Sequence, residues 1–366
     1  MLEQDLFYLL ALLRVEGVGD IMAKKLLTNF GSAEEIFKTK TNHIALIDGV
    51  GSVLLKNLKD KTIFEKANQE LQFIKKNNIK ASFFQEENYP ERLKHCIDSP
   101  VLIFSAGNIN LKNRKIISIV GTRQITSYGT EFCKNLIEDL VPLDPIIVSG
   151  FAYGVDIVAH QFAMENNLQT IGVLAHGLNQ IYPKAHKKYM SKMEENGGFI
   201  TEFWSSANPD KENFVRRNRI VAGMSEATIV IESADKGGSL ITANLANDYN
   251  RDVFAVPGRT TDKFSKGCNN LIKTQKANVL TSAADLVYML NWDIENKSKP
   301  VQKQLFVDLE SEEQKIYDYL LKNGKELLDI IALQCEFPIY KISGMLLNME
   351  LKGVIRPLPG KLFEAI

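Results

Sequence analysis

The segment at residues 214–219 concentrates residue types that bind phosphate and bases. It reads Phe-Val-Arg-Arg-Asn-Arg, so three guanidinium groups and one aromatic ring stand together with no carboxylate in the run. A planar guanidinium binds two phosphate oxygens at once, and a ring such as Phe214 can stack on an unpaired base at about 1 to 3 kcal/mol. A solvated helix face more often interleaves Glu with Arg, so this run favours a nucleic-acid contact.

Three glycine-containing segments follow predicted strands. They lie at residues 119–123, 149–156 and 232–243. Glycine lets a phosphate approach the backbone closely, and the N–H groups at the start of the next helix can hold it. Plain strand-to-helix turns use the same glycines, so that alternative stays open. The chain has neither G-x-G-x-x-G nor a Walker motif, and we therefore expect no dinucleotide, ATP or other cofactor.

Catalytic interpretations have less support. Asp156 and His160 stand four residues apart on a predicted helix, but a third metal ligand is not evident, and a capping Asp with a packed His is favoured. His176 and His186 have no nucleophile signature nearby. The sequence predicts neither a metal site nor an enzyme.

The elements that must position these residues alternate between strands and helices over residues 81–293. Helical spacing occurs between the strands, as at Leu136, Ile137 and Leu140. Apolar strands separated by helices imply a mostly parallel sheet covered on both faces, an α/β Rossmann-like, doubly wound fold whose ligands lie beyond the carboxyl ends of the strands. The predicted strands are 116–120, 146–149, 170–175, 199–201, 227–232, 252–256 and 279–281.

Helical segments flank this core. Residues 1–80 have helical periodicity with two glycine turns, at 17–19 and 49–51, each of which resembles a helix-hairpin-helix, as in SAM-like domains. The glycines can point N–H groups at a DNA phosphate, or can simply serve the turns of a helical bundle.

The segment at 294–309 is polar and reads as a linker. Residues 310–366 then predict a winged helix, with helices at 312–321, 327–334 and 339–351 and a hairpin at 354–363. Its candidate recognition helix has one cation, Lys341, so contact with a partner or support of a dimer is as well supported as reading a DNA groove.

Composition limits the alternatives. The chain has 366 residues with 44 Lys and Arg against 44 Asp and Glu, so any nucleic-acid site must be a local patch. The N-terminus lacks signal-peptide features and no apolar run reaches a membrane span, so we expect a cytoplasmic protein. The four cysteines, at positions 96, 133, 268 and 335, form no C-x-x-C pair and are interpreted as buried thiols.

Taken together, the motifs of the second domain resemble the DNA-processing protein A (DprA/Smf) family in order and spacing. The resemblance implies an extended Rossmann-like fold and no catalysis. It further implies single-stranded DNA bound in a basic pocket, a homodimer, and the protection of incoming DNA and loading of RecA recombinase during natural transformation. The matching segments are 120–123, 149–156 with 159–160, 177–178 with 182–183, 201–203, 214–223, 238–243, 251–258, and 267–269 with 271–272.

Site residues carried over from the resemblance are DNA contacts. The side chains of Arg123, Phe214, Arg217 and Arg219 would bind DNA, with backbone groups of Gly121, Gly238 and Ser239, and with Lys184 as a further candidate. The chain departs from the family pattern at three positions: Val215 replaces a common proline, Tyr153 a common arginine, and Ser233 a usual alanine. Without that arginine the 149–156 loop loses a phosphate contact, while Tyr153 could stack a base.

Two other functions remain open. Nucleotide-processing phosphoribohydrolases have a comparable core but carry P-G-G-x-G-T with a following glutamate, whereas residues 235–240 here lack the proline, the third glycine and the acid. A pure protein-interaction scaffold agrees with the zero net charge.

Overall fold

Seven apolar segments pair as a parallel sheet in the computed structural model, which describes residues 1–292, 309–358 and 362–365. Their order across the sheet is β6-β5-β4-β3-β7-β8-β9. Each overlaps a predicted strand, so the Rossmann-like α/β prediction is confirmed. The bounds are β3 (Ile116–Val120), β4 (Ile146–Ser149), β5 (Thr170–Val173), β6 (Gly197–Thr201), β7 (Ala227–Val230), β8 (Asp252–Ala255) and β9 (Asn278–Val279).

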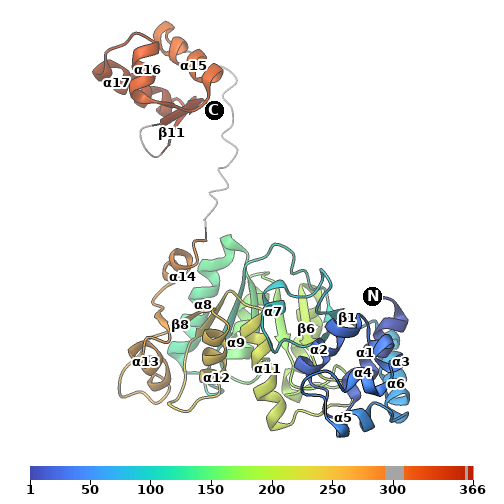
Figure 1. Ribbon diagram of the computed structural model, residues 1–366. Coiled ribbons are helices and arrows are strands. Elements are labelled where there is room, and N and C mark those ends of the chain that lie inside the picture. Colours follow the sequence, from blue (N-terminus) through green and yellow to red (C-terminus); the bar gives the residue numbers. More distant parts are fainter. Residues whose placement is uncertain (293–308, 359–361, 366) are drawn as a thin grey trace. The chain divides into compact units, whose positions relative to one another are not determined.

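Helices cover both faces of this sheet (Figure 1). Every residue of β3 to β7 is buried, which is why these strands are mostly apolar and contain no charged residue, instead of alternating with exposed polar residues. One face packs against α8 (Ser127–Leu140), α9 (Val155–Glu165) and α14 (Ala283–Met289), and the other against α11 (Lys211–Gly223), α12 (Ser239–Asp248) and α13 (Lys266–Lys273).

The sheet reverses its winding direction between β3 and β7. β3 pairs with β4 on one side and with β7 on the other, so the chain builds outward in both directions from this pair. The helix that follows β3, α8, lies on one face, and the helix that follows β7, α12, lies on the opposite face. Diverging loops leave a crevice at such a switch point, which is where ligands bind in open α/β sheets.

Two antiparallel strands at one end of the sheet were not predicted from the sequence. β1 (Lys80–Phe83) pairs antiparallel with β2 (Leu102–Gly107), and β2 pairs antiparallel with β6. Both are short, and the intervening segment has only the single-turn helix α7 (Glu91–Lys94) to punctuate it. A further set of short helices completes the core: η1 (Val141–Leu143), η2 (Lys184–Tyr189) and α10 (Met190–Glu195).

The N-terminal helices pack directly onto β2. Their core includes Val101, Leu102 and Phe104, and residues 1–293 form one compact unit. Both predicted glycine turns are present, because Gly17 (φ 93°) and Gly49 (φ 87°) adopt backbone conformations that favour glycine. The helices are α1 (Glu3–Arg14), α2 (Asp20–Phe30), α3 (Ala33–Lys38), α4 (Thr41–Ile44), α5 (Ser52–Asn57) and α6 (Thr62–Lys76).

A second compact unit spans residues 294–366. It has three helices around an apolar core, with a three-stranded sheet in the order β10-β12-β11, as a winged helix requires. The predicted linker lies almost entirely outside the described residues, and the boundary at residue 80 remains our proposal. The elements are α15 (Ser311–Asn323), β10 (Glu326–Leu327), α16 (Leu328–Gln334), α17 (Ile339–Leu351), β11 (Ile355–Leu358) and β12 (Leu362–Ala365).

In the part of the chain that the structure describes, no single helix is long and apolar enough to cross a membrane; only α16 and α17 taken together, bent by 109°, meet that length and composition.

Candidate nucleic-acid interface

A cavity of about 540 Å³ opens at the switch point of the sheet. Its walls are the loops that follow β3 and β7 and one side of α11. Of the eight predicted site residues, six line it: Gly121, Arg123, Phe214, Arg217, Gly238 and Ser239. Five other polar residues that line it were not predicted as DNA contacts: Thr122, Asp156, Lys211, Asn218 and Thr242.

The helical repeat of α11 places its functional residues on one wall. Phe214, Arg217 and Val221 recur at intervals of three and four residues, and all three line the cavity. Ile220 and Ala222, the sequence neighbours of Val221, are buried in the core between α11 and the sheet. The arginines were visible in the sequence, but only the helical repeat separates those that face the cavity from those that do not.

Glu232 holds the loop after β3 in place. Its backbone oxygen accepts a hydrogen bond from the N–H of Thr122 (2.7 Å), and its carboxylate accepts one from the N–H of Thr126 (2.9 Å). Thr126 in turn caps α8, because its hydroxyl accepts from the N–H of Gly129. This buried acid therefore ties the β3 loop, and Arg123 on it, to the end of β7.

Phe214 lies among two cations and a tyrosine ring. The guanidinium carbons of Arg123 and Arg217 lie 5.6 and 6.0 Å from its ring centroid, and the Tyr182 ring meets it edge-on at 5.8 Å. Phe214 is half-buried, and Arg123 and Tyr182 are exposed. Cation–π attraction orients the two arginines around the ring. Groups that can bind phosphate therefore lie next to a ring on which a base can stack.

Arg217 is a buried cation without an ion-pairing carboxylate. Only 5% of its surface is exposed, its Nε has no hydrogen-bond partner, and it takes part in none of the ion pairs among the described residues. Burial lowers its pKa to about 10, with nearby Asp156 opposing and Arg123 adding to the shift. It therefore remains charged at neutral pH, and an anion in the cavity would supply the missing partner.

The N-terminus of α12 forms the opposite wall. Gly238 caps this helix and Ser239 begins it, and the N–H groups of neither residue donate a hydrogen bond within the described chain. Free N–H groups at a helix start, with the helix dipole behind them, bind phosphate. Ser233, where the family usually has alanine, holds the turn, since its hydroxyl accepts from that of Ser239 at 2.9 Å.

Two family sequence models match the chain. The model described as DNA recombination-mediator protein A matches residues 80–291, and the one described as DprA winged helix domain matches residues 304–361. The chain belongs to the DNA recombination-mediator protein A family. Protein Smf of Escherichia coli is 32% identical over 75% of this chain and 74% of its own, and Protein Smf of Synechocystis is 28% identical over both full lengths.

Solved structures of two family members resemble the chain. DNA processing protein A of Streptococcus pneumoniae superposes with a TM-score of 0.65 at 28% identity, covering 79% of this chain and 98% of that one. DNA processing protein A of Helicobacter pylori gives a TM-score of 0.52 at 29% identity, covering 58% of this chain and 96% of that one, in a structure described as giving insight into its unique single-stranded DNA binding mode. The DprA/Smf family and the winged-helix prediction are thereby confirmed.

Two predicted contacts of this family member lie outside the cavity. Arg219 is on another side of α11, where its guanidinium pairs with Glu202 and with Asp20 of α2, so it joins the N-terminal helices to the core. Lys184 is exposed at the start of η2, two residues beyond Tyr182, and so stands near the rim. Their role in DNA binding stays a prediction.

Of the structural roles that the sequence favoured for Asp156 and His160, the packed His160 is confirmed, whereas Asp156 does not cap α9 and lines the cavity instead. Asp156 accepts a hydrogen bond from the N–H of Ala152 ahead of α9 (3.2 Å), and His160 is fully buried with Nδ1 2.6 Å from the Thr170 hydroxyl. Within the described ranges no three His, Cys, Asp or Glu residues cluster as a metal site would require. All four cysteines are buried, as predicted.

Gly150 gives Arg217 the space that it occupies. A methyl group on Gly150 would lie 1.5 Å from Nη1 of Arg217, so Gly150→Ala must push the guanidinium aside. Because the guanidinium is the far end of a flexible side chain, we expect folding to be kept and DNA affinity to fall about tenfold, or about 1.4 kcal/mol. Anisotropy of a labelled oligothymidine measures this loss. Gly344→Ala, which meets no atom within 4 Å, is the control and should bind normally.

Proposed function

We propose that this protein is a non-catalytic single-stranded DNA-binding protein whose binding site is the cavity among β3, β7 and α11. The observation that carries the proposal is Arg217, a buried cation that forms no ion pair among the described residues and whose charge the nearby Asp156 offsets only in part. Phosphate is the anion that this setting fits, since Arg123 and the free N–H groups of Gly238 and Ser239 surround the same cavity.

Single strands fit better than duplexes because Phe214 is available for stacking. Its half-buried ring offers a surface for an unpaired base, and a base within a duplex is already stacked on its neighbours. The described contacts reach the backbone and the face of a base, which carry no sequence code, so we expect little sequence preference. The single-stranded DNA binding of the Helicobacter pylori relative supports this proposal.

Family membership supports a wider role. We propose that the protein acts as a homodimer, protects incoming DNA during natural transformation and loads RecA recombinase onto it. The chain's balanced charge agrees with a local DNA site that leaves other surfaces for protein partners. RecA filament formation on oligothymidine coated with single-strand binding protein tests the loading step: the protein should shorten its lag, and an unchanged lag would contradict it.

Salt dependence separates the two kinds of contact. Arg123→Ala removes a phosphate contact, so the slope of log affinity against log salt should become shallower by about 0.7. Phe214→Ala should lower affinity by about 1 to 3 kcal/mol with little change in the slope, because stacking releases no counterion. Anisotropy of a labelled oligothymidine at several salt concentrations measures both quantities. Unchanged affinity in both variants would show that this cavity is not the DNA site.

A further inference from the structure

A second cavity, of about 440 Å³, lies beside α11 where the N-terminal helices meet the core. Arg14 and Gly19 line it from the N-terminal side, and Trp204, Asn208, Asn213 and Arg216 line it from the core. The whole cavity falls within the compact unit of residues 1–293. None of these residues belongs to the DNA site proposed above, so their gathering calls for a role of its own.

The chemistry of this cavity suits a planar, uncharged group with a hydrogen-bonding edge. The Arg14 guanidinium lies 5.4 Å from the centroid of the half-buried Trp204 ring, which gives the cavity a flat wall. The Asn213 side chain donates to the backbone oxygen of Asn208 (2.9 Å), and its amide oxygen is left to accept from a ligand.

Charge argues against a phosphate here. Arg216 pairs with Glu202 at 2.9 Å, and the Glu202 side chain is only 4% exposed. Asp20 and Asp210 also line the cavity, so its carboxylates outnumber its two arginines. The second carboxylate oxygen of Glu202 is buried without a hydrogen-bond partner. A ligand on this wall must therefore offer a hydrogen-bond donor, and an anion offers none. A nucleobase, which is flat, neutral and edged with N–H donors, meets these conditions.

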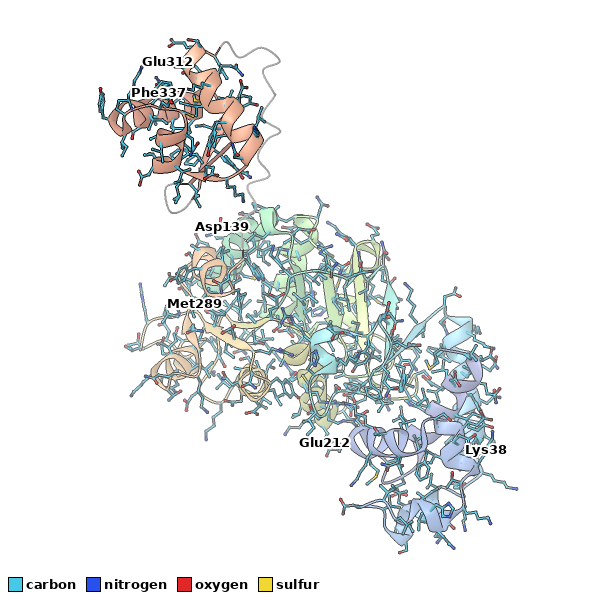
Figure 2. All side chains as sticks on the ribbon, turned by 45° about the horizontal axis from the view of Figure 1, so that its top comes forward. Lys38, Asp139, Glu212, Met289, Glu312 and Phe337 are labelled. Atoms are coloured by element: carbon cyan, nitrogen blue, oxygen red, sulfur yellow. The ribbon has the colours of Figure 1, made fainter. Side chains whose placement is uncertain are left out.

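The same helix carries both cavities. Lys211, Phe214 and Arg217 line the first, whereas Asp210, Asn213 and Arg216, each the preceding neighbour, line the second. Figure 2 labels Glu212, which marks this first turn of α11. An α-helix with its side chains is about 10 to 12 Å across, and a stacked strand advances about 3.4 Å per nucleotide. Three to four nucleotides therefore suffice to pass from one cavity to the other.

We propose that the second cavity receives a base of the same DNA strand, so that the strand crosses the start of α11 and its binding site extends to the N-terminal helices. This inference rests on the proposed DNA-binding function. It gives the N-terminal helices a direct part in DNA binding through Arg14, away from the two glycine turns.

Trp204 provides the test, because the chain has two tryptophans and Trp292→Phe leaves Trp204 as the only one. A 12-mer of deoxythymidine should quench Trp204 fluorescence, and the DNA concentration at half-maximal quenching should equal the midpoint of the anisotropy titration. A trimer should bind the first cavity without quenching Trp204. Anisotropy that saturates with the 12-mer while fluorescence stays constant would overturn the second cavity alone. Absence of any anisotropy change would overturn the DNA-binding function with it.

Affinity gives an independent readout in the otherwise unchanged protein. Arg14→Ala should lower the affinity for the 12-mer at least fivefold, which is the lower end of the contribution of one stacked base. The affinity for the trimer should not change. Lys76→Ala, which removes the same charge from an exposed position in the last turn of α6, should leave both unchanged. Equal loss in the two variants would show a general charge effect and contradict a base in this cavity.

Discussion

Replacing Arg217 by methionine is expected to abolish most DNA binding and to stabilise the free protein at the same time. The guanidinium supplies charge-assisted hydrogen bonds to phosphate, each contributing about 1.5 to 3 kcal/mol, so affinity should fall about 100-fold. In the free protein the same group is a buried cation that forms no ion pair among the described residues, and the attraction of nearby Asp156 does not make up for its loss of solvation. Its replacement by an apolar side chain of similar length should raise the free energy of unfolding by about 1 to 4 kcal/mol.

Arg219→Met is the matched control, two residues further along the same helix. Arg219 is also buried, but it pairs with Glu202 and Asp20, so its loss removes the ion pair of Asp20 and leaves the buried Glu202 carboxylate paired with Arg216 alone. We expect Arg219→Met to lower the free energy of unfolding by about 3 to 5 kcal/mol. The urea concentration at the midpoint of unfolding should therefore rise in Arg217→Met and fall in Arg219→Met. A destabilised Arg217→Met would show that a partner inside the protein, and not DNA, satisfies this cation.

Stability should fall steeply in mild acid because of His160. Burial lowers the pKa of His160 to about 3, with His186 and Arg217 nearby acting in the same direction. A histidine whose pKa is depressed in the folded state binds protons only in the unfolded state between its two pKa values. The free energy of unfolding should therefore fall by about 1.4 kcal/mol for each pH unit below about 6.5, which amounts to about 2.7 kcal/mol at pH 4.5.

The hydrogen bonding of His160 explains why the folded protein resists its protonation. The Thr170 hydroxyl donates to the backbone oxygen of Ile147, so it accepts from Nδ1–H of His160, and the opposite ring nitrogen, Nε2, is buried without a partner. A proton on Nε2 would be an unsolvated charge. In His160→Asn, whose amide can still donate to Thr170, the loss of stability between pH 6.5 and 4.5 should shrink by about 2.7 kcal/mol. An identical pH profile in urea unfolding would exclude His160 as the cause.

Local patterns in the sequence determined the elements and the chemistry of this protein. Continuous apolar runs predicted all seven parallel strands because a sheet covered on both faces must bury every residue. The arginine-rich segment and the glycine turns predicted a phosphate site at the strand ends, since these residue types have few other reasons to cluster. β1 and β2 escaped because they pair antiparallel, outside the alternation of strands and helices, with only the single-turn helix α7 between them.

Only the tertiary structure decided which arginine does what. Arg217 and Arg219 are two residues apart in a single run, yet one lines a cavity at the switch point and the other joins the N-terminal helices to the core. Two residues on a helix point about 200° apart, so adjacent letters of the sequence face different surroundings. A distant segment contributes Asp20 as a partner for Arg219, whereas Arg217 forms no ion pair among the described residues, and this difference exists only once the chain has folded.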